Sequence, residues 1–161
     1  MSAFIAIDAD PVVTAEDPSA GSIAGDGFWP AVDLDRVRAI GRIPTMVTID
    51  QLREATIGAV IAVTRQLIAW RQGHLDAGRA TLAAIDPTLI AGTLRLEHLF
   101  LRAVTATVAA DLLDTRQEIG ATREGRDRAD VEEVPSPDWR RMAIHAIRDI
   151  AGKPRTRARL L

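Results

Sequence analysis

Cysteine and tyrosine are both absent from this chain of 161 residues, and aromatic residues make up only 4% of it. Without cysteine, the protein forms neither disulfides nor zinc or iron–sulfur sites that depend on thiolate ligands. With few aromatic side chains, leucine, isoleucine, valine and alanine have to fill the core, a composition that favours closely packed helices. A chain of this length fits one domain, or one domain with arms, and buries roughly 70% of its unfolded surface.

Long apolar runs are also absent. The longest apolar stretch covers residues 55–63 and lies between Glu54 and Arg65, whereas a membrane-spanning helix needs about 20 apolar residues. No basic region precedes an apolar run at the start of the chain, so we expect no secretory signal. We therefore predict that the protein has no membrane partner.

Charge is unevenly distributed along the chain. Residues 1–35 contain seven acidic residues and no basic one, whereas residues 36–161 contain 20 basic and 15 acidic residues. All the basic residues except Lys153 are arginine, which makes forked contacts to carboxylates and phosphates, although a GC-rich genome produces the same bias. The acidic start and the basic end indicate either two interaction arms or two solvated termini.

Hydrophobic spacing predicts an all-α protein built as a small bundle of three main helices with additional short ones. The first main helix begins at a capping box, Thr48 with Gln51, and continues for about 24 residues to Gly73. The second covers residues 93–117. The third covers residues 136–151, with a serine as N-cap and a proline at the first helical position. No alternating strand pattern of useful length and no internal repeat is present.

The first two main helices have apolar residues around much of their circumference. Ile57, Ile61 and Ile68 lie off the main apolar stripe of the first helix, so one neighbouring helix cannot cover it. We expect such helices to be central in their own domain or to pack against another subunit. The side chains that we predict to be buried inside the subunit are Val63, Leu67, Trp70, Leu99 and Phe100.

The chain divides into three parts. Residues 1–30 form an extended, acidic arm whose aromatic pair, Phe28 and Trp29, is expected to be anchored on an apolar surface. Residues 31–152 form the helical domain, and residues 153–161 form a basic tail. The helical domain also contains three segments of lesser length: a short helix over 34–40 with N-cap Asp33, a short helix over 79–85, and a charge-dense hinge over 118–134.

Residues that could carry chemistry are present, but not in arrangements typical of a catalytic or metal site. His74, His98 and His145 have no second histidine, and no glutamate at a spacing of three or four residues, to complete a ligand set. The pair Glu132 and Glu133 lies in the charge-dense hinge, where no burial would shift their pKa values. Nucleophile elbows and phosphate-binding glycine loops are lacking. We predict no catalytic residue, no metal and no cofactor.

Four stretches together resemble the head completion proteins of tailed bacteriophages. They are "FWPAVDLDRVRAIGRIP", "TIDQLREATIGAVI", "HLFLRAVTATVAADLLD" and "WRRMAIHAIRDIAGKPR", in matching order over roughly residues 28–155. The last stretch is the most distinctive, because an aromatic residue and a basic pair precede an Ala/Ile-periodic helix that ends in Gly-Lys-Pro-Arg. The chain departs from the family in having no tyrosine in its second main helix, and in Pro135 and Pro137 before the last one.

The resemblance implies a structural adaptor in the neck of the virion, synthesised in the cytoplasm of the bacterial host. Such a protein forms a homo-oligomeric ring, usually of twelve copies, which docks on the portal protein and extends the DNA channel. The packaged DNA passes through without sequence-specific binding, and the tail or a tail-completion protein attaches to the ring. No reaction is catalysed.

The resemblance also implies a role for the basic tail, which is expected to reach the portal and meet acidic groups there. Gly152 and Pro154 should end the last helix and release the chain. The residues that we predict to dock on the portal are Gly152, Lys153, Pro154, Arg155, Arg157, Arg159, Leu160 and Leu161.

Two other classes of protein remain as alternatives. A helical DNA-binding or packaging module, such as a small terminase-like protein, is favoured by the surplus of basic residues after residue 35. However, no helix carries a dense basic face and no helix-turn-helix spacing is evident. A small all-α enzyme would need converging polar groups, which the sequence does not indicate.

Overall fold

The computed structural model describes residues 21–121 and 135–154, and within them the chain forms six helices and two short antiparallel strand pairs. The mostly helical architecture confirms the predicted fold class. The helices are α1 (Leu34–Ile40), α2 (Ile49–Gln66), α3 (Ile68–Asp76), α4 (Leu82–Ile85), α5 (Arg95–Ala121) and α6 (Ser136–Ile150). The strands are β1 (Ser22–Ile23), paired with β2 (Val32–Asp33), and β3 (Leu89–Ile90), paired with β4 (Thr93–Leu94).

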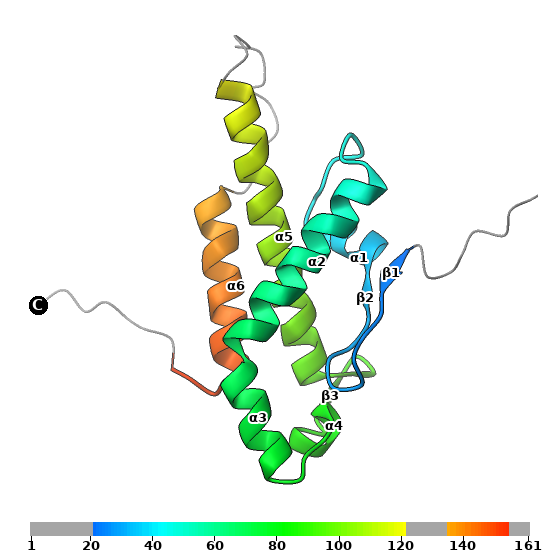
Figure 1. The fold of residues 1–161 in the computed structure, drawn as a ribbon, viewed down its shortest axis with the longest axis vertical. Helices are drawn as coiled ribbons and strands as arrows, with labels where there is room; N and C mark the ends of the chain where they lie inside the picture. Colours follow the sequence, from blue (N-terminus) through cyan, green and yellow to red (C-terminus); the bar gives the residue numbers. More distant parts are fainter. Residues whose placement is uncertain (1–20, 122–134, 155–161) are drawn as a thin grey trace, which may run out of the picture.

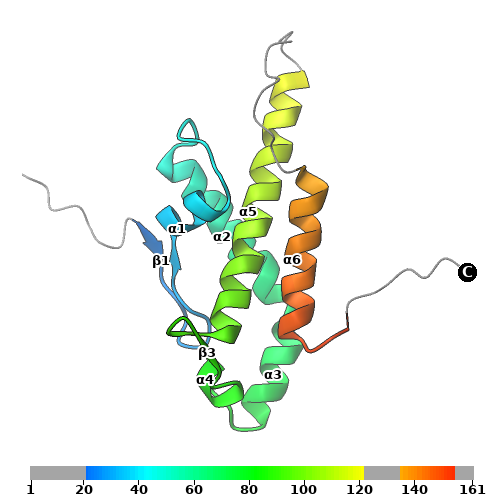
Figure 2. The same cartoon turned by 180° about the vertical axis from the view of Figure 1, so that it is seen from behind.

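Helix α5 is the axis of the molecule. Figures 1 and 2 show α6 alongside it, running in the opposite direction, while α2 crosses α5 at an angle. The β1–β2 pair and α1 lie on the side of the bundle away from α6. None of the helices in the described part of the chain is long and apolar enough to cross a membrane.

The predicted capping box at the start of α2 is present. The Thr48 hydroxyl accepts a hydrogen bond from the Gln51 N–H at 3.2 Å, and the Gln51 side chain accepts one from the Thr48 N–H at 3.0 Å. This exchange satisfies two N–H groups that the first turn of a helix leaves unpaired. The N-cap of α1 is also confirmed, because the Asp33 carboxylate accepts from the Arg36 N–H at 2.8 Å.

The prediction of one continuous helix of about 24 residues is wrong, because the chain breaks at Leu67, where φ is −99° and ψ is 4°. The N–H of Leu67 is shared between the carbonyls of Val63 and Thr64. One turn earlier, the Thr64 hydroxyl donates to the Val60 carbonyl at 2.8 Å. Such side-chain bonds to the preceding turn bend helices, so α3 leaves α2 in a new direction.

Two further expectations about local structure need correction. Ser136 is not the N-cap of the last helix but its first residue, and Pro135 occupies the capping position. The two strand pairs were not predicted, because strands of two residues are too short to show an alternating pattern.

The main core lies between α2, α5 and the β2–α1 segment. Val63, Leu67 and Phe100 are buried as predicted. The predictions for Leu99 and Trp70 are wrong, since both are only partly buried, at the edge of this core. Its largest fully buried side chains include Val32, Leu34, Val37, Leu52, Val63, Leu67, Phe100, Val104 and Val108.

Part of the segment assigned to the arm is built into the domain. Strand β1 pairs with β2, and the Leu34 N–H donates to the Gly21 carbonyl at 2.9 Å. Phe28 and Trp29 are each only 5% exposed, so the expected aromatic anchor is confirmed. Residues 1–20 and the greater part of the charge-dense hinge lie outside the described residues.

Candidate interaction site

The last helix, α6, is attached to α5 by an interface made largely of alanine. Ala143 and Trp139 of α6 pack on α5 in a buried cluster of their own, separate from the main core. Small side chains let two helix backbones approach closely, so α6 is firmly positioned even though it is short. The partners on α5 are Ala106, Ala109, Ala110 and Leu113.

Polar contacts fix the first turn of α6 on α5. Arg140 forms an ion pair with Asp114 and lies 3.7 Å from a carboxylate oxygen of Asp111. The Ser136 hydroxyl and, after it, Arg140 hold the pKa of Asp114 below its usual value. Asp114 in turn raises the pKa of Arg140. Burial raises the pKa of Asp111, although Arg140 opposes that shift.

The other end of α6 is closed by a Schellman motif, a left-handed turn that satisfies the last carbonyls of a helix. Gly152 has a φ of +65°, which is accessible to glycine at little cost. The Gly152 N–H donates to the Asp149 carbonyl at 3.3 Å, and the Lys153 N–H donates to the Arg148 carbonyl at 2.8 Å. The helix therefore ends where the sequence predicted, and the turn changes the direction of the chain.

Arg148 then holds the outgoing chain from one side. Its Nε donates to the Pro154 carbonyl at 3.1 Å, and its Nη2 donates to the same oxygen. In Figures 1 and 2 the segment up to residue 154 leads away from the end of α6 and not back along the helices. A guanidinium that binds a carbonyl in this way holds the chain in place at Pro154.

Of the residues predicted to dock on the portal, the structure describes three. Gly152, Lys153 and Pro154 lie together at the end of α6 and are exposed. The remaining five, Arg155, Arg157, Arg159, Leu160 and Leu161, lie outside the described residues, so their role stays a prediction. The sequence analysis did not identify Arg148 as part of this site, although its position one turn before Gly152 could have indicated it.

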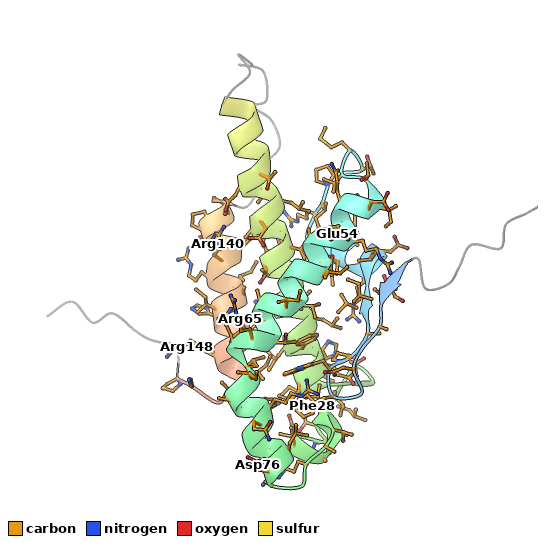
Figure 3. All side chains as sticks on the ribbon, in the orientation of Figure 1. Phe28, Glu54, Arg65, Asp76, Arg140 and Arg148 are labelled. Carbon is orange, nitrogen blue, oxygen red and sulfur yellow. The ribbon has the colours of Figure 1, made fainter. Side chains whose placement is uncertain are left out.

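The arginines of α6 are engaged within the subunit. Arg140 contacts Asp114, Arg141 forms an ion pair with Asp138, and Arg148 binds the Pro154 carbonyl. Figure 3 shows Arg140 and Arg148 near opposite ends of the helix. This arrangement differs from the unoccupied basic face that a DNA-binding helix presents to phosphates.

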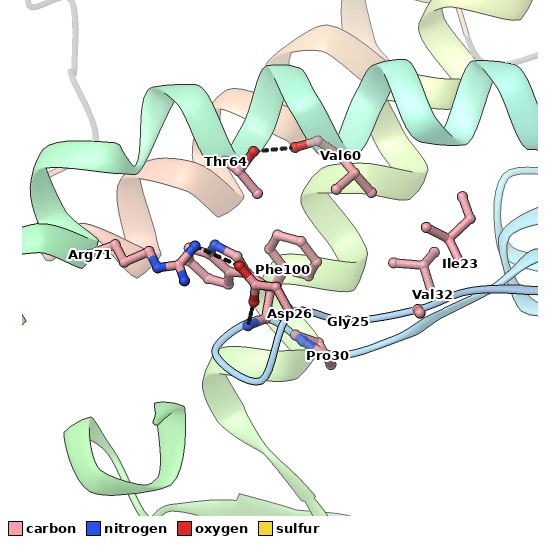
Figure 4. A pocket seen from close by; sticks show the side chains of 11 residues that line it. Ile23, Gly25, Asp26, Pro30, Val32, Val60, Thr64, Arg71 and Phe100 are labelled. Carbon is pink, nitrogen blue, oxygen red and sulfur yellow. Dashed lines mark hydrogen bonds and ion pairs between the residues drawn. The ribbon is translucent and has the colours of Figure 1, made fainter. Parts of the chain in front are cut away.

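A cleft of about 170 Å³ opens between the β1–β2 turn, α2 and α5 (Figure 4). Arg71 donates to Asp26 at its mouth, across 2.6 Å. Burial acts to raise the pKa of Asp26, but hydrogen bonds from the Trp29 and Phe28 N–H groups and from Arg71 outweigh it and lower the pKa. The Trp29 ring lines the cleft, and its buried Nε1 has no hydrogen-bond partner among the described residues.

The histidines are not arranged as metal ligands. The His74 ring meets Trp70 edge-on with centroids 4.5 Å apart, and burial, followed by Arg79, lowers its pKa. His98 Nε2 lies 2.8 Å from the Ile90 carbonyl. Within residues 21–121 and 135–154, no group of three histidine, aspartate or glutamate side chains is placed to hold a metal ion.

Large apolar side chains are exposed on several elements. They lie on the outward side of α2 and α3, on the β3–β4 hairpin, around the end of α1 and the start of α2, and on α6. They are Ile40, Met46, Ile49, Ile61, Ile68, Leu89, Ile90 and Ile144. The sequence pattern had indicated the first of these surfaces, through Ile61 and Ile68.

Comparison with known proteins gives a match over most of the chain. The family described as "Phage head completion protein (GPL)" matches residues 23–161. The head completion/stabilization protein of Escherichia phage P2 is 30% identical over 129 residues, which are 80% of this chain and 76% of that protein. No solved structure gives a significant match.

Proposed function

The chain belongs to the phage head completion protein (GPL) family, and from this premise we propose that it forms a ring in the neck of the virion, between the capsid and the tail. The proposed ring contains twelve copies, docks on the portal protein and offers an attachment surface to the tail or its completion protein. The packaged DNA passes through the channel of the ring, and no reaction is catalysed.

The end of α6 is the observation that carries this proposal. Helix α6 is fixed on α5 at its first turn and along its alanine face, so its last turn is a rigid base. The Gly152 turn and the Arg148 contact then direct the chain away from the helices. A tail on a rigid base is oriented before it binds, which reduces the ordering cost of docking. Lys153 and the three arginines beyond it supply positive charge for acidic groups on the portal.

Exposed apolar residues on different elements support assembly into a ring. Closed rings are built from head-to-tail contacts, in which one face of a subunit meets a different face of the next. Leu89 and Ile90 on the β3–β4 hairpin are one exposed apolar site, and Ile144 on α6 is another. The subunit therefore offers more than one apolar site to neighbours.

Truncation after Gly152 tests the docking role. The described core lies before this point, so the truncated protein should keep its helical circular-dichroism melt within experimental error. In cells infected with a phage that lacks its own copy of the protein, the truncated protein should restore few infectious particles. Imaging of the particles should then show portals without the added ring.

A matched control separates charge from length. Arg155, Arg157 and Arg159 are changed together to glutamate in the full-length chain, and in a second variant to lysine. The lysine variant should keep most of the yield and the glutamate variant should lose it. Normal yields from the truncated protein would exclude the docking tail.

The terminase-like alternative receives no support from the comparisons, which match the head completion family. Binding that depends only on phosphate charge weakens steeply as salt rises. Strong, salt-dependent binding of the purified protein to duplex DNA would favour that alternative over the adaptor.

A further inference from the structure

The outward side of α2 carries a continuous stripe that no other described element covers. Glu54, Gly58, Ile61 and Arg65 follow one another at intervals of three or four residues, which places them on one face of α2. Ile68, the first residue of α3, continues this exposed surface beyond the break at Leu67. All five are exposed, and Ile61 and Ile68 are 59% and 65% exposed. We call this set the α2 stripe. The opposite side of α2 carries the buried residues Leu52, Thr56, Ala59 and Val63.

Gly58 is the first sign that the α2 stripe has a partner. Glycine in an exposed helix interior costs about 1 kcal/mol relative to alanine. A Cβ added at Gly58 would meet nothing within 4 Å, and the residue has no positive φ that would require glycine. No contact among the described residues therefore explains why position 58 is glycine. Close approach of a second helix at this point would explain it.

The charges on the stripe are the second sign, because they are complementary to a reversed copy of themselves. Glu54 and Arg65 form no ion pair within the described residues, and Figure 3 shows them well separated along α2. Suppose that a second α2 lies antiparallel and Glu54 faces Arg65 of the other copy. Counting along the two helices, Ile61 of each copy then faces Gly58 of the other. In this one register, Glu54 of each copy faces Arg65 of the other, and Ile61 of each copy faces Gly58 of the other.

We propose that two copies of this chain pack their α2 stripes together, antiparallel, and form a two-fold dimer of the free protein. Each Ile61 fills the space above the partner's Gly58, and two Glu54–Arg65 pairs close the ends of the contact. A two-fold contact is complete with two copies and cannot continue around a ring. The dimer is therefore a form that the protein adopts before assembly, and it goes beyond the proposed function.

Charge exchange tests the register. The association of purified protein is measured by sedimentation equilibrium over a range of concentrations. Glu54→Arg and Arg65→Glu should each weaken dimerisation at least tenfold, since each places two like-charged pairs in the contact. The double variant restores opposite charges and should recover most of the wild-type affinity. Arg102→Glu, an exposed change on α5, is the matched control and should leave the affinity unchanged.

Cross-linking gives a second, independent measurement, because the natural chain has no cysteine. In the proposed register the two copies of residue 58 lie about 4.5 Å apart along the helix axis. A short bismaleimide should therefore link Gly58→Cys protein into dimers efficiently. Arg102→Cys, at an exposed position on α5, should give few dimers. Circular-dichroism melts check that each variant is folded.

Three outcomes would overturn the proposal. The first is a wild-type protein that stays monomeric at all concentrations, and the second is a dimer whose affinity is unchanged by either single charge reversal. A stripe that instead binds a purified portal or tail component, with no self-association, would also reject it. The sedimentation and cross-linking experiments measure self-association of the free protein, so their failure would leave the proposed role in the virion unaffected.

Discussion

Trp29 stacks on Phe100, with ring centroids 4.6 Å apart and an interplanar angle of 13°. The Trp29 ring also meets Phe28 edge-on at 5.0 Å and lies 6.0 Å from Trp70. Trp29 comes from the segment before the helices, whereas Phe100 lies in α5. In a chain with so few aromatic residues, this cluster joins the start of the domain to its central helix.

Replacing Phe100 should therefore destabilise the protein strongly. Phe100→Ala removes a fully buried ring and leaves a cavity, so the free energy of unfolding should fall by about 3–5 kcal/mol. Leu99→Ala, one residue away but only partly buried, should cost about 1–2 kcal/mol. Urea titrations followed by circular dichroism measure both. Equal costs would show that Leu99 belongs to the core.

Sequence periodicity identified Val63, Leu67 and Phe100 because it indicates which side of a helix faces inward. It could not place Trp70, which follows a break that no residue type announces. It failed for Leu99 as well, since the spacing does not reveal where the edge of the core lies. The Arg71–Asp26 pair was also out of reach, because it joins two segments whose approach depends on the tertiary fold.

At the scale of elements, the ends of helices were more predictable than their continuity. Thr48, Asp33 and Gly152 act as predicted, because capping depends on a few neighbouring residues. The break at Leu67 depends on hydrogen bonds that could equally have formed in a continuous helix. The candidate site was predicted only in part. The turn at Gly152 could be predicted because it depends on neighbouring residues, whereas the contact from Arg148 to Pro154 depends on the geometry of that turn.

The left-handed turn at Gly152 makes a specific demand on residue type. Gly152→Ala puts a Cβ on a residue with φ of +65°, so the free energy of unfolding should fall by about 1–2 kcal/mol. Gly73→Ala in α3 is the matched control, since a Cβ there would meet nothing within 4 Å. That change should stabilise the protein by up to about 1 kcal/mol. Urea unfolding distinguishes them, and two stabilising results would contradict the strained turn.

At the scale of the whole molecule, acidic side chains link different elements of the fold. Asp26 links the β1–β2 turn to α3 through Arg71, Asp86 links the end of α4 to the start of α5 through Arg95, and Asp114 links α5 to α6 through Arg140. These ion pairs are exposed, and each makes only a modest contribution to the free energy of unfolding. Together they oppose separation of the elements along the length of the fold.

The three pairs predict how stability depends on pH. Hydrogen bonds and ion pairs lower the pKa of Asp26, Asp86 and Asp114 in the folded protein from the usual 3.8. A lowered pKa contributes stability above pH 3.8 that is lost as the pH falls through the folded-state value. The raised pKa of Asp111 acts in the opposite sense. The midpoint of urea unfolding should therefore be lower at pH 2.5 than at pH 5.

Asparagine variants assign this effect to particular groups. Asp26→Asn should lower the unfolding midpoint at pH 5, and its difference from the wild type should shrink as the pH falls toward 2.5. Asp35→Asn, an exposed change on the first turn of α1, serves as the control. A difference that stays constant across this range would mean that Asp26 acts through packing alone.

The three tryptophans divide between the two buried clusters, and this division gives the protein two optical reporters of its own. Trp29 lies in the main core with Trp70 close to it at the edge of that core, while Trp139 lies apart from them between α5 and α6. Because tyrosine is absent, ultraviolet emission comes from these indoles without that background. Changing Trp139 to phenylalanine leaves a signal from the main core, and changing the other two leaves a signal from the α6 contact. Release of α6 can thus be followed separately from melting of the bundle, with no added dye.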